Sequence, residues 1–279
     1  MKKALIVANL AKEEAGPLVN EIENFLLQKD YAVQKICFSG PPKEKRVDKF
    51  DIVFSLGGDG TVLYASRLVP ESTPVFAVNL GGVGFITEIA KDEWRQAFDK
   101  FISGKLGISK RIMIDIEVHR EGKILERVCG LNDAVVASRG ISKLIMLDVE
   151  LDSARLGRYR ADGIIIATPT GSTAYSAAAG GPLLFPEMDA MILTPICPYT
   201  LSNRPLVVPG EEKITIIVER DQRAELILTI DGQDVINLKP LDRIFITRSN
   251  REAFIIRSDK RSFYEVLRSK LSWSGGPDD

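Results

Sequence analysis

The sequence predicts an α/β N-terminal domain with a mostly parallel sheet, followed by a β-rich C-terminal domain. Before residue 105, short apolar runs alternate with stretches of helical periodicity and end in Gly-rich sequence, the pattern of a doubly wound sheet. Near residue 110 the hydrophobic period changes to two, which indicates strands with one buried face. A chain of 279 residues can form one large domain or two modest ones.

The first half is expected to alternate strands with helices. Ligands of such a sheet bind beyond the carboxyl ends of its strands, so the sequences that follow the apolar runs are the first candidates for a site. The expected elements are strands at 4–9, 31–38, 51–56 and 74–78, and helices at 12–29, 62–68 and 92–102.

The second half is expected to be mostly β, with a hairpin turn at Asp231-Gly232-Gln233 and an edge strand between prolines at 201–209. A helix is expected at 262–272, and the last five residues read as a frayed tail. The other strand candidates are 112–118, 131–137, 145–151, 214–218, 224–230, 235–238, 243–247 and 254–256.

Composition excludes several classes of function. The 37 basic and 38 acidic residues give a net charge of −1, so no overall field attracts nucleic acid or an anionic membrane. The apolar run at 4–8 is too short for a signal peptide, and no run approaches the length of a membrane-spanning helix. Three widely separated cysteines form neither a disulfide framework nor a metal site. We expect a cytoplasmic protein.

The strongest local signal is Gly57-Gly58-Asp59-Gly60-Thr61, between an expected strand and an expected helix. Glycine-rich backbone before a helix N-terminus can present N–H groups to phosphate. Asp59 repels phosphate unless a metal ion intervenes or its task is to accept a proton. Alternatively, the segment is a tight turn with Thr61 or Asp59 as helix N-cap, and the spacing alone does not decide. The chain has neither a Walker A motif nor G-x-G-x-x-G after the first strand.

Two further segments could form a binding site. A second Gly-rich strand end, residues 81–85, is either another turn or a wall of the same crevice. The segment Thr168-Pro169-Thr170-Gly171-Ser172-Thr173-Ala174-Tyr175-Ser176 follows an apolar strand with five hydroxyl side chains, which suit a nucleoside. Taken alone, the segment is slightly better explained as a helix start capped by Ser172 or Thr173, with Tyr175 as a half-buried aromatic residue.

Isolated polar residues are weaker candidates. Asn132 and Asp133 could bind vicinal hydroxyls, although a turn explains them nearly as well. Arg160 could meet a phosphate, and a surface charge is its default interpretation. His119 is expected to be an exposed strand residue, which argues against His-based triads and HExxH metal sites.

Taken in chain order, these motifs resemble the NAD kinase family over nearly the whole chain. The GGDGT motif is shared with diacylglycerol and sphingosine kinases and with phosphofructokinases, so the TPTGSTAY segment discriminates between them. The resemblance implies a nucleotide-binding domain at 1–108, to which a segment at about 250–279 returns, and a substrate-binding and oligomerisation domain at 109–249. It also implies a homodimer or homotetramer whose sites lie between domains and include residues of a neighbouring subunit.

The same resemblance implies transfer of the terminal phosphoryl group of ATP to the 2′-hydroxyl of the adenosine ribose of NAD. Mg²⁺ would arrive with ATP, and no protein metal ligands are expected. Asp59 would activate the 2′-hydroxyl, and the residue at Arg160 indicates a preference for NAD over NADH. The implied phosphate contacts are Gly57, Gly58, Gly60 and Thr61; the implied NAD contacts are Phe85, Asn132, Asp133, Arg160, Asp162, Thr170, Thr173, Ala174 and Tyr175.

Two other functions remain open at this point. A lipid kinase of the diacylglycerol or sphingosine type would share GGDGT, but it needs an interfacial acceptor site, and the sequence shows no amphipathic membrane helix or basic juxtamembrane cluster. A non-enzymatic nucleotide-binding regulator would share the pockets without needing Asp59.

Overall fold

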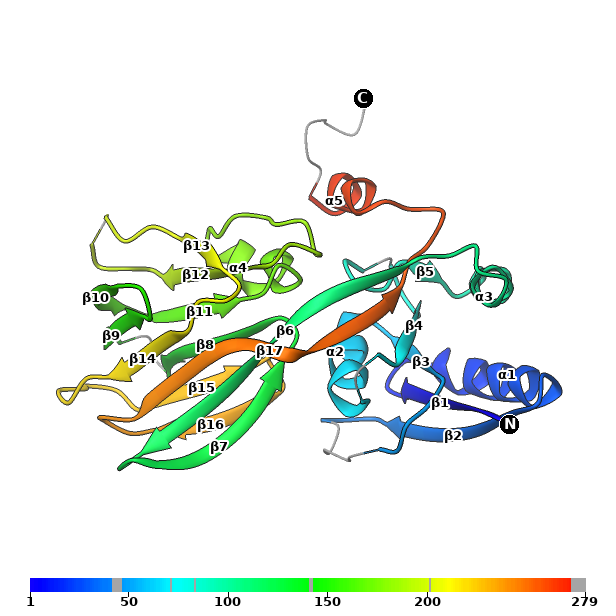
Figure 1. Cartoon of the computed structure of the whole chain (residues 1–279), viewed down its shortest axis with the longest axis horizontal. Coiled ribbons are helices and arrows are strands. Elements are labelled where there is room, and N and C mark those ends of the chain that lie inside the picture. Colours follow the sequence, from blue (N-terminus) through cyan, green and yellow to red (C-terminus); the bar gives the residue numbers. More distant parts are fainter. Residues whose placement is uncertain (42–46, 71, 83, 141–142, 201, 272–279) are drawn as a thin grey trace. The chain divides into compact units, whose positions relative to one another are not determined.

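The computed structural model describes residues 1–41, 47–70, 72–82, 84–140, 143–200 and 202–271. It divides into two compact units (Figure 1). Unit 1 contains Met1–Lys110 and the segment that begins at Ala253, and unit 2 contains Arg111–Glu252. The chain passes between the units along strands β6 (Ile108–Arg120) and β17 (Arg243–Ile256). The predicted return of the C-terminal segment to the first unit is therefore confirmed.

Unit 1 is built on a parallel sheet in the order β4-β3-β1-β2, with the end of β17 parallel to β4 on the other side. β3 is buried along its whole length, which explains why it reads as a continuous apolar run in the sequence. Besides the end of β17 and the start of β6, the described strands of this unit are β1 (Lys2–Asn9), β2 (Tyr31–Phe38), β3 (Ile52–Gly57), β4 (Pro74–Asn79) and β5 (Ile89–Ala90).

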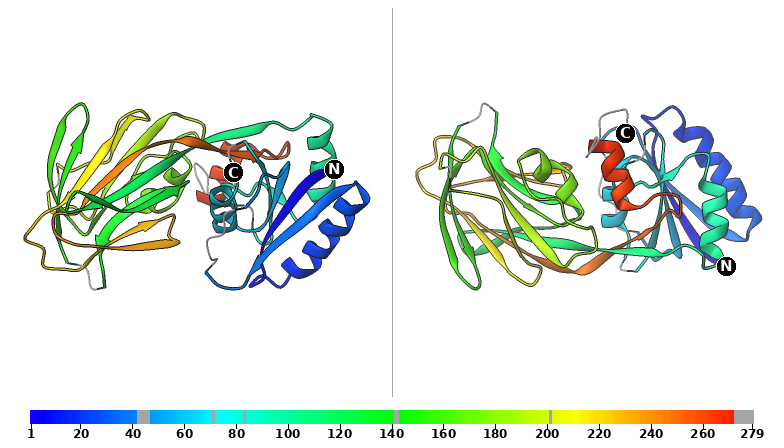
Figure 2. Two further views of the ribbon diagram at one scale, coloured as in Figure 1. Left: turned by 60° about the horizontal axis from the view of Figure 1, so that its bottom comes forward. Right: turned by 90° about the horizontal axis from the view of Figure 1, so that it is seen from above.

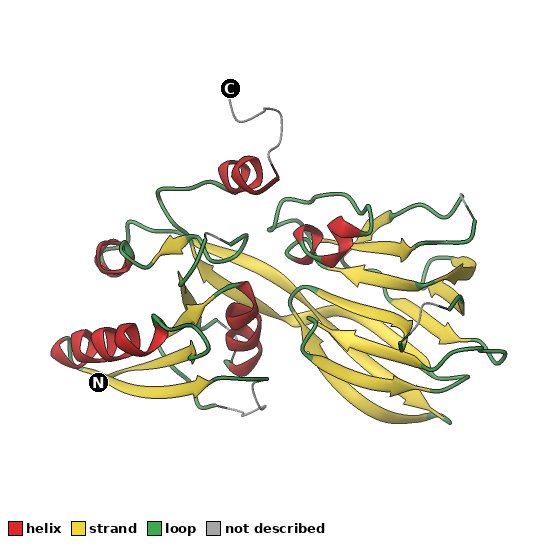
Figure 3. Ribbon diagram, turned by 180° about the vertical axis from the view of Figure 1, so that it is seen from behind, coloured by secondary structure: helices red, strands yellow, loops and turns green. Residues whose placement is uncertain are grey.

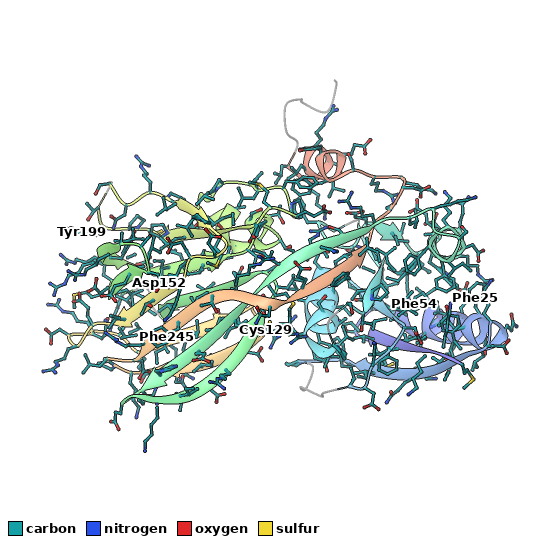
Figure 4. The ribbon with its side chains drawn as sticks, in the orientation of Figure 1. Phe25, Phe54, Cys129, Asp152, Tyr199 and Phe245 are labelled. Carbon is teal, nitrogen blue, oxygen red and sulfur yellow. The ribbon has the colours of Figure 1, made fainter. Side chains whose placement is uncertain are left out.

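Helices cover both faces of this sheet (Figure 2). α1 (Ala15–Gln28) and α3 (Trp94–Ile102) share one core with β1, β3 and β4, whereas α2 (Asp59–Leu68) packs on the opposite face. Phe98 of α3 joins the two layers of that core, because its ring centroid lies 5.8 Å from that of Phe25 of α1 and 5.4 Å from that of Phe54 of β3. Figure 4 labels Phe25 and Phe54. α2 begins three residues before the predicted Val62, so Asp59 is its first residue.

Unit 2 consists almost entirely of strands (Figure 3). One antiparallel sheet has the order β13-β12-β11-β8-β15-β16, and the other joins β10, β9, β14, β17, β6 and β7. Alternate apolar residues of both sheets meet in one core. The strands are β7 (Lys123–Gly130), β8 (Asp133–Ser138), β9 (Ile145–Leu151), β10 (Arg155–Ala161), β11 (Gly163–Ala167), β12 (Ala190–Ile196), β13 (Leu206–Pro209), β14 (Ile214–Val218), β15 (Leu226–Ile230) and β16 (Asp234–Leu238).

The segment with five hydroxyl side chains, residues 168–176, is called the hydroxyl-rich segment below. It covers the outer face of strands β8, β11 and β12. Leu184 and Ala179 pack there on a second, smaller core. The predicted helix is short: a 3₁₀ turn at Gly171–Thr173 is followed by α4 (Tyr175–Ala178). Neither Ser172 nor Thr173 is an N-cap, so that alternative is wrong. The segment is therefore a turn held against a sheet.

The C-terminal helix α5 (Phe263–Leu271) lies within the predicted range 262–272. Among the described residues of this helix, Val266 and Leu267 are buried. The tail expected at 275–279 lies outside the described residues, as does Leu201 at the start of the predicted edge strand. β13 confirms that strand for 206–209, at the edge of its sheet.

In the described part of the chain, no helix has the length and apolar character needed to span a membrane.

Candidate active site

Asp59 stands at the start of α2, and its carboxylate is bound by a loop 26 to 28 residues further along the chain. Phe85 N–H donates to Oδ2 at an N···O distance of 2.9 Å. The N–H groups of Ile86 and Thr87 donate to Oδ1 at 3.2 and 3.0 Å, and Thr87 Oγ1 lies 2.8 Å from the same oxygen. Successive N–H groups that converge in this way stabilise an anion. Gly58, not Asp59 or Thr61, is the N-cap, so the N-cap alternative is wrong.

The loop can approach Asp59 only because residue 84 lacks a side chain. A β-carbon at Gly84 would overlap Asp59 Oδ1 and Thr87 Oγ1. On the other side of the loop, Asn79 at the carboxyl end of β4 donates from Nδ2 to Thr87 Oγ1 at 2.6 Å. Asn79 Oδ1 accepts the N–H of Gly81 at 2.7 Å. Two strand ends of the sheet thus meet around one carboxylate.

The remaining GGDGT residues surround the N-terminus of α2. Thr61 is buried, and its side chain packs against the backbone of Gly57, while Gly58 is half-buried and Gly60 is exposed. The helix N-terminus carries a partial positive charge beside the exposed part of this loop. The exposed part of the loop thus has the local potential that a phosphate group favours, and phosphate binding there stays a prediction.

In unit 2, the turn that carries Asn132 and Asp133 is organised by Asp231. Asp231 Oδ1 accepts the N–H groups of Leu131, Asn132 and Asp133 at 3.1, 2.7 and 3.2 Å, and Oδ2 also accepts from Leu131 at 2.9 Å. Asp231 N–H donates in return to the carbonyl of Asp133 at 2.9 Å. Asp231 adopts a φ of 52°, a left-handed conformation that aspartate tolerates better than most residues.

The hydroxyl-rich segment holds the other side of this turn. Thr168 N–H donates to the carbonyl of Asn132 at 2.8 Å, and Thr168 Oγ1 donates to that of Leu131 at 2.5 Å. A β-carbon at Gly171 would overlap the carbonyl of Asn132, so only glycine allows this approach. The structure therefore brings together two of the predicted motifs, Asn132-Asp133 and TPTGSTAY.

Four of the five hydroxyls in this segment are used within the fold. Thr168 donates to Leu131, Ser172 to the carbonyl of Pro169, Thr173 to that of Thr170, and Ser176 pairs with Thr194. Thr170 Oγ1 and Asn132 Oδ1 are buried and have no hydrogen-bond partner among the described residues. Buried polar atoms without a partner are costly, so these two oxygens, close to each other in the fold, make this turn a candidate binding site for a polar ligand. Ala174 is half-buried and Tyr175 is 48% exposed.

The carboxyl group of Asp133 is in an unusual electrostatic environment. Burial raises its pKa from 3.8 to about 7, and the negative charge of Asp231 adds to the effect. Asp231 remains the anion of the pair because backbone N–H groups surround its oxygens. Near neutral pH, a substantial fraction of Asp133 is therefore a neutral acid that can donate a hydrogen bond as well as accept one.

We expect this shift to make stability depend on pH. Between about pH 4 and 7 the folded chain keeps the Asp133 proton that the unfolded chain releases, so the free energy of unfolding falls as pH rises. Below that window both states are protonated, and above it both are ionised. Urea denaturation of the wild-type chain and Asp133→Asn at pH 5 and pH 8 measures the effect. The variant should gain stability relative to wild type at pH 8; an equal difference at the two pH values would contradict it.

Arg160 and Asp162 are not brought to this turn within unit 2. The register pairs Gly163 with Ala137 and Ala167 with Asp133, so Asp162 lies at the opposite end of β11 from the turn. Five strand residues correspond to roughly 17 Å. Arg160 is exposed on β10, and its guanidinium lies 4.8 Å from the ring centroid of Tyr199.

Comparisons with known proteins agree with both halves of the chain. Residues 41–106 match the model of the ATP-NAD kinase N-terminal domain, and residues 131–258 match that of the C-terminal domain. The NAD kinase of Treponema denticola is 44% identical over 99% of this chain and 98% of its own. The chain belongs to the NAD kinase family. A second member, from Moorella thermoacetica, is 42% identical over 100% of this chain and 92% of its own.

Solved structures place the fold in the NAD kinase family as well. An NAD kinase from Archaeoglobus fulgidus in complex with ATP has a TM-score of 0.76 and 27% identity over 99% of this chain and 100% of its own. A yeast NADH kinase complexed with NADH has a TM-score of 0.84 over 99% of this chain and 89% of its own, and at 24% identity it supports the fold alone. The fold class and family predicted from the sequence are confirmed, as is the enzyme class.

Three polar residues of this NAD kinase family member escaped the motif analysis. Asp231 was interpreted as part of a hairpin turn and counted among the family motifs, but no contact was predicted for it, because an Asp-Gly pair carries no sign of bonds to residues about 100 positions away. Thr87 follows a Gly-rich segment with nothing to distinguish it. Asn79 could have been noticed, because it places an amide at the carboxyl end of a buried parallel strand, where ligands of such sheets bind.

Proposed function

We propose that this chain transfers the terminal phosphoryl group of ATP to the 2′-hydroxyl of the adenosine ribose of NAD, giving NADP. The observation that carries the proposal, beyond family membership, is the pair of buried, unpartnered oxygens on Asn132 and Thr170. Asn132 lies on the same turn as the partly protonated Asp133, and Thr170 lies on the segment held against that turn; together they offer donor and acceptor groups that suit the base and hydroxyls of adenosine.

Asp59 is proposed as the group that receives the 2′-hydroxyl proton. Its Oδ2 accepts one backbone hydrogen bond, whereas Oδ1 accepts two from backbone N–H groups and one from the Thr87 hydroxyl, so Oδ2 retains more capacity to accept a further proton. An aspartate is a weak base, but the transition state of phosphoryl transfer is loose and the nucleophile loses its proton late. Catalysis then depends mainly on positioning and charge neutralisation, which a fixed carboxylate can provide.

The donor is proposed to be the MgATP complex, with its phosphates at Gly57, Gly58, Gly60 and Thr61. Within the described ranges, no three His, Cys, Asp or Glu side chains gather into a metal site. A Mg²⁺ ion that enters with ATP needs few protein ligands, because phosphate oxygens and water complete its shell. It would neutralise charge on the transferred group and offset the repulsion between Asp59 and phosphate.

The remaining predicted contacts stay proposals. Phe85, Thr173, Ala174 and Tyr175 are proposed to line the adenosine pocket. Asp162 and Arg160 lie too far along unit 2 to share that pocket in the same chain, which favours a role at the nicotinamide end, from a neighbouring subunit of a homodimer or homotetramer. Free Cys37, Cys129 and Cys197 fit a reducing compartment, and we propose the cytoplasm.

The proposed activity is tested by asking which acceptor gains phosphate. The chain is incubated with ATP and Mg²⁺ together with NAD, NADH or diacylglycerol, and NADP, NADPH and phosphatidic acid are quantified. We expect NADP as the main product, NADPH with a lower kcat/KM, and no phosphorylated lipid. Asp152→Asn, an exposed carboxylate of unit 2, serves as a matched control that should behave as wild type. Phosphorylation of the lipid, or the absence of phosphate on all three acceptors, would contradict the proposal.

A further inference from the structure

The positions of the nitrogen and oxygen atoms around Asp59 determine which group donates and which accepts in each hydrogen bond. The N–H of Gly81 can only donate, so the Asn79 atom 2.7 Å from it is the carbonyl oxygen and the other amide atom is Nδ2. Nδ2 can only donate, so Thr87 Oγ1, at 2.6 Å, is its acceptor. The hydroxyl hydrogen of Thr87 is then available for Asp59 Oδ1, which lies 2.8 Å away. The order of donation is Asn79 to Thr87 to Asp59.

This order makes the two oxygens of Asp59 unequal. Oδ1 accepts hydrogen bonds from Ile86 N–H, Thr87 N–H and Thr87 Oγ1. Because this oxygen has only two lone pairs, at least two of the three donors share one of them. Oδ2 accepts from Phe85 N–H. Rotation of the carboxylate would break the bonds of Oδ1, so the side chain has one preferred orientation. In that orientation Oδ2 is the oxygen with a lone pair available to a ligand.

The hydroxyl of Thr87 is not needed to fill space or to close the loop. The backbone N–H groups of 85–87 hold the carboxylate without it, and the missing side chain of Gly84 provides the room. Asn79 and Thr87 are both buried, so the relay is shielded from water. A buried relay that ends on a charged oxygen strengthens the last bond, because the local dielectric is low.

We propose that Thr87, oriented by Asn79, is a positioning residue for phosphoryl transfer that holds Asp59 Oδ1 so that Oδ2 alone meets the acceptor hydroxyl. The inference rests on the proposed role of Asp59. Thr87 acts through Asp59 and does not touch either substrate, so its contribution belongs to the chemical step. Its loss should lower kcat and leave substrate binding nearly unchanged.

Three variants of the full chain test this role. Thr87→Val keeps the shape and removes the hydroxyl, and it should lower kcat by about 10–100-fold, the effect of losing one hydrogen bond to a charged group. The KM values for ATP and NAD should change by less than about threefold. Thr87→Ser restores the hydroxyl and should recover most of the turnover. In Asn79→Asp, the new carboxylate cannot donate to Thr87 and instead accepts the hydrogen of the Thr87 hydroxyl. Asp59 Oδ1 then loses that hydrogen bond, so this variant should lower kcat as Thr87→Val does.

Thr73→Val is the matched control for loss of a buried hydroxyl. Thr73 is 4% exposed in the same unit, and its Oγ1 has no hydrogen-bond partner among the described residues. Its kcat should equal that of wild type. Thermal unfolding identifies variants that fail to fold, and Asn79→Asp carries the test if Thr87→Val is one of them.

Asp59→Asn separates this inference from the function on which it rests. An inactive Asp59→Asn together with a Thr87→Val that keeps wild-type kcat would overturn the role of Thr87 and leave the proposed function in place. Failure of Thr87→Ser to recover turnover would also overturn it, because the hydroxyl would then not be the group that matters. An Asp59→Asn variant with normal turnover would overturn the role proposed for Asp59 and, with it, the role of Thr87.

Discussion

Asp59→Asn is expected to lower kcat by about 10²–10⁴-fold while the KM values for ATP and NAD change little. The amide keeps the size of the carboxylate and can keep one oxygen toward Ile86 and Thr87. Its nitrogen then faces Phe85 N–H, so one bond is lost, and no basic atom remains to receive the 2′-hydroxyl proton. Steady-state kinetics with each substrate varied in turn provides the measurement.

The control for this variant is Asp92→Asn, an exposed carboxylate of the same unit that should leave kcat unchanged. Circular dichroism and thermal unfolding establish whether Asp59→Asn is folded. A folded Asp59→Asn enzyme with turnover near that of wild type would exclude Asp59 as the proton acceptor.

Asp231→Asn is expected to raise the KM for NAD by about 10–100-fold with little change in kcat, because hydrogen bonds to a charged group contribute about 1.5–3 kcal/mol. The carboxylate holds three successive N–H groups of the turn that carries Asn132 and Asp133. An asparagine lacks the negative charge that these donors stabilise, and where its oxygen replaces Oδ1 its amide nitrogen replaces Oδ2 and faces the Leu131 N–H. The turn should then lose its fixed geometry, and the free energy of unfolding should fall by about 2 kcal/mol.

Asp221→Asn is the matched control, since Asp221 is an exposed aspartate of the same unit. The KM for ATP provides an internal reference, because Asp231→Asn is expected to weaken the binding of NAD and to leave the binding of ATP unchanged. If stability falls while the KM for NAD stays at its wild-type value, Asp231 supports the fold alone and the proposed adenosine site is wrong.

Local patterns in the sequence predicted most elements of both units, but they did not predict strands β5, β7, β10 and β12. Buried parallel strands such as Ile52–Gly57 are continuous apolar runs, whereas apolar residues alternate along half-buried antiparallel strands such as Ile145–Leu151, so each type of strand has its own hydrophobic period. The hydroxyl-rich segment was expected to lead into a helix, but the approach of Gly171 to the Asn132 carbonyl and the packing of Leu184 hold it as a turn. Tertiary contacts override local preference there.

Bonds between distant residues explain what the sequence did not predict at the site. The side chain of Asp59 could have capped its own helix, and no local feature shows that it binds residues 85–87 instead. The same holds for Asp231 and the 131–133 turn, about 100 residues away. Motifs thus indicated which segments are candidates for the site, whereas the partners of each carboxylate, and the raised pKa of Asp133, follow from the fold.

A crystal structure of the wild-type enzyme with NAD bound tests the central claim most directly, through the distance between Asp59 Oδ2 and the 2′-oxygen of the adenosine ribose. We predict a distance of about 2.6–3.2 Å, with Thr87 still bound to Oδ1 and with the adenosine in contact with Asn132 and Thr170. A 2′-oxygen that lies out of reach of this carboxylate, with the dinucleotide otherwise fully ordered, would contradict the proposed reaction.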